Sequence, residues 1–295
     1  MADTENKAVA TKADADLPAH LQGKTKDVKF GNVDSSDIII PRVKLLQSTS
    51  PEVEAYDTAK IGQFWHTLAE QPMGDRLRIV PVFMKKEVVV WAPRGDDRGI
   101  LARSSDCINW DEGYANLEHT VKIKNVKEPY TFNTRDNVEQ SKLLQFGQIH
   151  GDPDSKPFAA LTYRFMFLFP DFLELGPAII INTRSGVKPA KQLISKIELR
   201  PVDHYAQQYV MSTTEETSDD GPYKGYSYTA DGYASEEVYN MAKELYDTYK
   251  DLDWKASEET EDAVPPSDGG KGAATAGRVG GEASEKTGKQ ADGKF

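Results

Sequence analysis

Apolar and polar positions alternate along residues 158–169, which read F-A-A-L-T-Y-R-F-M-F-L-F. Side chains of a β-strand point to opposite faces in turn, so this pattern predicts a long strand with aromatic rings on one face. The rings of that face belong to Tyr163, Phe165, Phe167 and Phe169. Arg164 lies between the first two and is expected on the opposite face. We expect Phe167 and Phe169 to lie in the core.

Residues 76–91 form the first convincing β region, R-L-R-I-V-P-V-F-M-K-K-E-V-V-V-W. β-Branched and other apolar residues recur there at strand spacing. Pro81 has no backbone N–H to give to a neighbouring strand, and the pair Lys85 and Lys86 interrupts the apolar pattern. The segment therefore predicts an edge strand, a bulge or a turn at these residues.

Other alternations and apolar runs are shorter. They predict strands at 121–124, 130–132, 178–181 and 205–213. The turn residues of 219–222 predict a hairpin that joins the last of these strands to a partner at 223–228.

Two segments show the period of a helix. Pro189 suits the first helical turn, and Pro201 ends the segment. Ser235 is placed to cap a second helix, with two acids in its first turn. The apolar stripes of the two helices contain Ala190, Leu193, Ile194 and Ile197, and then Val238, Met241, Ala242, Leu245 and Tyr249. The order of elements predicts an α+β fold, mainly antiparallel β, with an OB-like partly open barrel, two C-terminal helices and disordered termini.

Composition changes at both ends of the 295-residue chain. Residues 1–32 contain few large apolar side chains, and residues 251–295 are acidic and then rich in glycine. Segments of this kind cannot bury enough apolar surface to offset about 1–2 kcal/mol of backbone entropy per residue. We expect a disordered arm, a single β-rich α+β domain at 33–250 and a disordered tail.

Charge is distributed unevenly. The net charge is −11, yet residues 61–210 carry +1 and residues 211–295 carry −10. An acidic tail beside a nearly neutral body increases solubility. Alternatively, it competes with a polyanion for the cations of the body or recruits a basic partner.

The sequence gives little support for catalysis. It has no phosphate loop, no GxSxG elbow, no HExxH and no GxGxxG. His150, Asp152 and Asp154 could bind a metal ion, but the glycine and proline between them are more typical of a solvent-exposed turn. Cys107, the only cysteine, has no basic residue near it in the sequence that would activate it as a nucleophile. No apolar signal core or membrane-length run is present. We therefore expect a cytoplasmic protein that is not an enzyme, with no membrane association, metal or cofactor. Oligomer formation is left open.

Nucleic-acid binding has more candidates, because rings stack on bases and cations neutralise phosphates. Three clusters combine the two residue types. The first contains Trp91 with Lys85, Lys86 and Arg94; the second contains Tyr130 with Lys122, Lys124 and Lys127; the third contains Tyr163, Arg164 and Phe165 with Arg184, Lys188, Lys191 and Lys196. A packed sheet with a solvated covering helix explains the third cluster equally well.

Three segments resemble proteins encoded by tailed bacteriophages. They are I-P-R-V-K-L-L-Q at 40–47, V-P-V-F-M-K-K-E-V-V-V-W at 80–91 and V-Y-N-M-A-K-E-L-Y-D-T-Y at 238–249. The layout is similar to that of phage single-stranded DNA-binding proteins, which combine an OB-like body with an acidic tail. The resemblance implies that Asp251 to Asp268 bind phage or host replication or recombination proteins. This tail departs from the pattern, because its last residues, Gly293 to Phe295, are not acidic.

These observations predict a non-catalytic phage protein of the host cytoplasm that binds single-stranded DNA in replication or recombination. Stacking and phosphate neutralisation would supply the affinity, and the tail would recruit partners. Two alternatives remain open: a structural or assembly protein of the virion, and an acidic protein that interacts with host factors.

Overall fold

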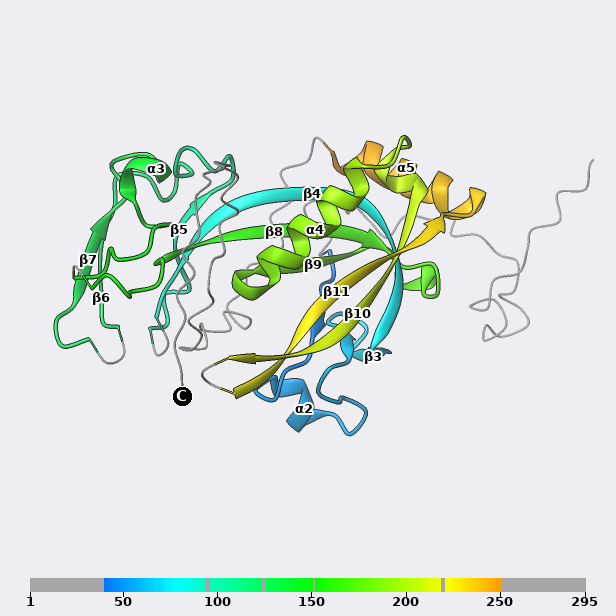
Figure 1. Cartoon of the computed structure of the whole chain (residues 1–295), viewed down its shortest axis with the longest axis horizontal. Helices are drawn as coiled ribbons and strands as arrows, with labels where there is room; N and C mark the ends of the chain where they lie inside the picture. Colours follow the sequence, from blue (N-terminus) through cyan, green and yellow to red (C-terminus); the bar gives the residue numbers. More distant parts are fainter. Residues whose placement is uncertain (1–39, 94–95, 124–125, 151, 219–220, 251–295) are drawn as a thin grey trace, which may run out of the picture.

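The computed structural model describes residues 40–93, 96–123, 126–150, 152–218 and 221–250 (Figure 1). The arm and the tail expected to be disordered lie outside the described residues. The strands are β1 (Val43–Leu45), β2 (Phe64–His66), β3 (Gln71–Gly74), β4 (Arg76–Trp91), β5 (Ile100–Ser104), β6 (Glu118–Val121), β7 (Tyr130–Asn133), β8 (Ala159–Leu168), β9 (Ala178–Thr183), β10 (Gln207–Ser218) and β11 (Gly221–Tyr233). The helices are α2 (Pro51–Ala55), α3 (Val138–Ser141), α4 (Val187–Glu198) and α5 (Glu236–Tyr249), with 3₁₀ turns η1 (Leu173–Leu175), η2 (Arg184–Gly186) and η3 (His204–Ala206).

Antiparallel pairing dominates the described residues. A six-stranded sheet has the order β11-β10-β4-β8-β9, and β5 pairs with β4. Smaller sheets are formed by β1-β2-β3 and by β6-β7. The prediction of a mainly antiparallel α+β fold is confirmed. The described pairings leave β9 and β11 at opposite ends of the large sheet, and the finer expectation of an OB-like barrel is not confirmed.

The long strand β4 connects the parts of the large sheet, as its arc in Figure 1 shows. It pairs with β10 over 76–79, with β8 over 80–90 and with β5 over 88–91. On the side of β4 away from β8, Pro81 therefore has no partner strand. Proline lacks a backbone N–H and is tolerated at such an unpaired position. The register shifts between Pro81 and Phe83. Of the three structures expected here, the bulge is confirmed, and the side of β4 away from β8 is a local edge at Pro81. The turn is wrong, because residues 76–91 form one continuous strand.

The main core lies between the large sheet and α4. Ring-bearing residues of β8 pack there with β4, β10 and β11, and Ala190 and Leu193 of α4 close the cluster. Figure 1 shows α4 lying across β8 and β9 beside β11. α4 is amphipathic, so one of its faces enters this core and the other remains in water. Full burial of one Phe side chain contributes about 1.5–3 kcal/mol.

The opposite face of the sheet packs against α5. Val80 and Val82 of β4 contact Val238 and Ala242 there. Ser235 caps α5, since its Oγ accepts a hydrogen bond from the backbone N of Val238 at 3.4 Å, which confirms the predicted cap. A separate apolar cluster joins the far end of β4 to β5, β7 and α3.

The strands and helices near the C-terminus differ in length from their predictions. β11 extends beyond its prediction at both ends, whereas β10 begins later than predicted, at Gln207, and continues past its predicted end to Ser218. Tyr205, expected at the start of a strand, lies in η3. α4 places Pro189 in its first turn and ends before Pro201, as predicted.

Candidate nucleic-acid interface

The aromatic rings of β8 face the interior. Tyr163 is 5% exposed and Phe165 is 1% exposed. Their ring centroids lie 6.5 Å apart, in a stack that continues to Phe167. Rings beside cations make Tyr163 and Phe165 candidates for stacking on bases, with a packed sheet as the alternative. The stacking role is wrong for both residues and the packed sheet is confirmed, because α4 covers that side of the sheet and a base cannot reach either ring. Phe167 and Phe169 lie in the core, as predicted.

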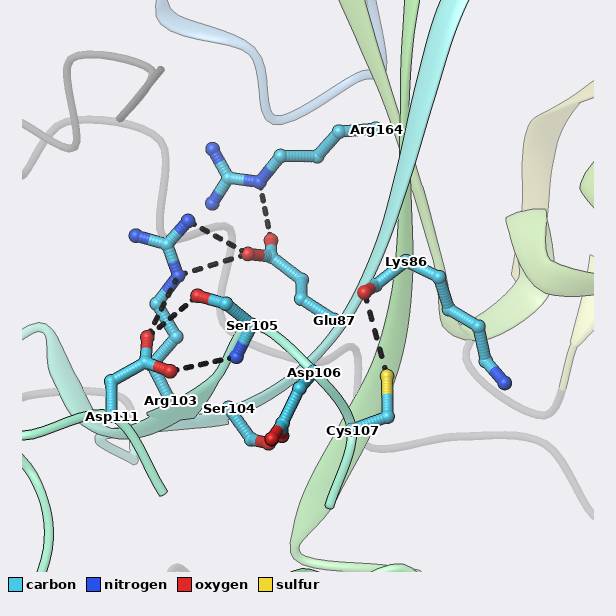
Figure 2. A network of polar contacts seen from close by, with 9 residues as sticks. All are labelled: Lys86, Glu87, Arg103, Ser104, Ser105, Asp106, Cys107, Asp111 and Arg164. Atoms are coloured by element: carbon cyan, nitrogen blue, oxygen red, sulfur yellow. Dashed lines mark hydrogen bonds and ion pairs between the residues drawn. The ribbon is translucent and has the colours of Figure 1, made fainter. Parts of the chain in front are cut away.

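Arg164 belongs to a buried network of charged side chains (Figure 2). Its Nε donates to Oε1 of Glu87. The Nε and Nη2 atoms of Arg103 each lie 2.9 Å from Oε2 of the same carboxylate. Asp111 lies 3.8 Å from Nε of Arg103 and accepts two hydrogen bonds from Ser105, at 2.8 and 2.7 Å. Two arginines and two acids thus balance in charge.

This network changes the role expected of Arg164. The side chain comes from β8, its acid from β4 and the second arginine from β5, so the network ties three strands together. Buried charges are tolerated only when they are paired and hydrogen-bonded. The prediction that Arg164 contacts phosphate is wrong, because its guanidinium is buried and hydrogen-bonded to Glu87.

The two described cations of the first cluster do not share a surface. Lys86 is exposed and Lys85 is half-buried. Neighbours on a strand point to opposite faces, so the two lysines cannot contribute to one surface. Trp91 is half-buried at the end of β4, paired with Ile100, and Arg94 lies outside the described residues. The backbone oxygen of Lys86 accepts a hydrogen bond from Sγ of Cys107 at 3.4 Å, and burial raises the pKa of that thiol.

The second cluster keeps its cations exposed but not its ring. Lys122 and Lys127 are exposed in the connection between β6 and β7, while Lys124 lies outside the described residues. Tyr130 is half-buried, with edge-on contacts to Phe158 at 5.4 Å and to His150 at 5.7 Å. Burial raises the pKa of Tyr130.

The third cluster brings its cations together on the outer side of α4. Lys188 and Lys191 are exposed, and their ammonium groups have no hydrogen-bond or ion-pair partner among the described residues. Arg184 is exposed in η2, just before the helix. Lys196 is exposed at the other end, where its Nζ donates to the backbone oxygen of Tyr228. The cations of this cluster therefore lie on the surface, and its rings lie inside.

The structure adds Arg200 and Tyr233 to the candidate site. Arg200 follows α4, and its guanidinium carbon lies 5.3 Å from the ring centroids of both Tyr209 and Tyr233. Tyr209 is buried, whereas Tyr233 is 62% exposed. A cation beside an exposed ring is thus found at the end of the α4 cation row. The two residues are far apart in the sequence, and no local pattern connects them.

A shallow hollow of about 430 Å³ lies on the other side of the sheet, lined by Arg76, Arg78, Asp171, Val210 and Asp231. Nε of Arg78 donates to both carboxylate oxygens of Asp171, at 2.9 and 3.1 Å. This hydrogen bonding lowers the pKa of Asp171. The two acids balance the two arginines, so the hollow offers an anion little net attraction.

The described residues hold no group of three or more His, Cys, Asp or Glu side chains placed to bind a metal ion. None of their helices is long and apolar enough to cross a membrane. They define a β-rich α+β protein whose candidate site is a charged helix surface. The chain belongs to the family of Pam3 phage gp34-like proteins, whose sequence model matches residues 9–255, and it is thus a bacteriophage protein. No curated protein and no solved structure matches it.

Proposed function

We propose that this phage protein binds single-stranded DNA without catalysis, as an accessory protein of replication or recombination. The observation that carries the proposal is the row of exposed cations on α4. Lys188, Lys191 and Lys196 extend over about 12 Å of helix. Each lysine that neutralises a phosphate releases a condensed counterion, which favours binding.

The balance of charge supports the same site. Residues 61–210 carry a net charge of only +1, so the cations of α4 are not part of a generally basic surface. The acids of Asp251 to Asp268 lie outside the described residues, and we propose that they compete for these cations or recruit a replication or recombination protein. We also propose the OB-like barrel that the sequence predicts, although binding by the α4 surface does not require it.

The test is titration of fluorescent oligo-dT with the full chain at several salt concentrations. Affinity should fall linearly with salt on logarithmic axes, with a slope of about −0.7 per neutralised phosphate. The double variant Lys188→Gln/Lys191→Gln removes two exposed cations and should make the slope shallower by about 1.4. Lys60→Gln/Lys243→Gln removes two exposed lysines elsewhere and should leave the slope unchanged.

The competing explanation is a solvated helix face without a ligand. No binding by the wild type at low salt would refute the proposal. Recovery of the chain in purified particles would then favour a structural or assembly role in the virion. If the chain binds, oligo-U tested beside oligo-dT distinguishes RNA from DNA. Replacing the acids of Asp251 to Asp268 by amides in the full chain should tighten binding if the tail competes.

A further inference from the structure

We propose that Tyr233 is a base-stacking residue of this interface, held in place by Arg200. The inference rests on the proposed function and extends it from phosphate contacts to bases. The rings of β8 are buried, so the aromatic part of a single-strand site must come from elsewhere. Tyr233 is 62% exposed. A ring with this much free surface beside cations can stack on a base of any identity.

The groups that support Tyr233 are hydrogen-bonded, and two of them, Tyr209 and Gln207, are buried. The guanidinium of Arg200 lies 5.3 Å from the rings of Tyr233 and Tyr209, and its Nη1 donates to the backbone oxygen of Gly232 at 2.6 Å. The hydroxyl of Tyr209 donates to Gln207 Oε1 at 2.6 Å, and both residues are fully buried. Cation–π contacts of this kind fix a ring without covering it completely.

The turn that carries Arg200 is also held. Nε2 of Gln207 donates to the backbone oxygens of Ile197 and Val202, at 3.1 and 2.9 Å. Gly232, which receives the Arg200 hydrogen bond, has φ +87°, a conformation that favours glycine. Arg200 and Tyr233 therefore occupy defined positions before any ligand arrives.

Two exposed apolar residues lie close to Arg200 in the sequence. Leu199 is 83% exposed and Val202 is 41% exposed, and both lie within two residues of Arg200. Exposed apolar surface beside a charged surface is typical of an interaction site. The adjacent α4 lysines are complementary to phosphate, which favours a nucleic-acid strand: its bases would cover this apolar surface while its phosphates meet the lysines.

The experiment compares two fluorescent oligonucleotides of equal length, oligo-dT and an abasic strand, each titrated with the full chain. Tyr233→Ala should weaken oligo-dT binding about 5- to 150-fold and leave abasic binding unchanged. Tyr233→Phe should bind oligo-dT as the wild type does. Phe146→Ala is the matched control, because Phe146 is also 62% exposed but lies in another part of the chain, and it should change neither affinity.

The titrations distinguish an error in the stacking role of Tyr233 from an error in the proposed function. If Tyr233→Ala binds oligo-dT as the wild type does while Lys188→Gln/Lys191→Gln binds more weakly, the stacking role is wrong and the phosphate site stands. Equal losses of Tyr233→Ala on both strands would also overturn the stacking role, because no base contact would be involved. If the wild type binds neither strand, both proposals fall. Thermal melting checks that the variant is folded.

Discussion

Replacing Glu87 by glutamine keeps the shape of the side chain and removes its negative charge from between two arginines. The Glu87 side chain is 3% exposed and interacts with Arg103 at 2.9 Å and with Arg164. Removing one partner of a buried ion pair costs about 3–5 kcal/mol, because the remaining charge stays buried without its counter-charge. In a domain of about 150–250 residues, this loss lowers the melting temperature by about 6–20 °C.

Calorimetry and circular dichroism on the full chain measure this change at neutral pH. Glu118→Gln serves as the control, because it breaks an exposed ion pair with Arg135 at 3.7 Å. Exposed pairs of this kind contribute less than about 1 kcal/mol. A Glu87→Gln variant that melts with the wild type would show that the two arginines do not depend on this carboxylate, and it would refute the reasoning.

Three further predictions concern the stability of the fold. Phe165→Ala should lower the free energy of unfolding by about 3–5 kcal/mol, measured with urea, whereas a folded Phe165→Leu variant should bind oligo-dT like the wild type. Burial lowers the pKa of His66, whose Nδ1 accepts from the backbone N of Ala69 at 3.0 Å. Below pH 6.5 the imidazole of His66 binds a proton in the unfolded chain but not yet in the folded chain. The free energy of unfolding should therefore fall as pH falls from 6.5 toward the lowered pKa. His66→Gln should flatten this slope in thermal melts recorded at several pH values. Ser235→Ala should cost about 1 kcal/mol in thermal melts through loss of the α5 cap; no change would mean that the 3.4 Å bond to Val238 is not significant.

The faces of individual elements could be predicted, but not which faces meet. Alternation gave the two sides of β8 correctly, and the helical period gave the apolar side of α4. The choice between core and binding platform for Tyr163 and Phe165 depended on which side of the sheet α4 covers. That choice is set by the path of the chain between β9 and α4, and no local pattern records it. The bulge at Pro81 was among the predicted options because proline restricts a strand locally.

The contacts that define the candidate site are long-range. Glu87 meets Arg164 at a separation of 77 residues, and this pairing depends on the register of β4 against β8. Arg200 meets Tyr233 because β11 extends past its predicted end and returns beside the end of α4. The sequence indicated that cations gather near α4, because those cations are local to one helix. The sequence could not indicate that the ring of Tyr233 lies beside these cations.

Side chains occupy the outer edge of β11, and this affects how any partner can bind. The backbone oxygens of Lys224, Tyr228 and Gly232 accept hydrogen bonds from Gln47, Lys196 and Arg200, respectively. Gln47 also accepts from the backbone N of Lys224 at 2.9 Å. An edge strand whose polar groups are already bonded is a poor template for another strand. A partner that approaches this edge therefore meets the side chains of α4 and Tyr233, the surface proposed to bind single-stranded DNA.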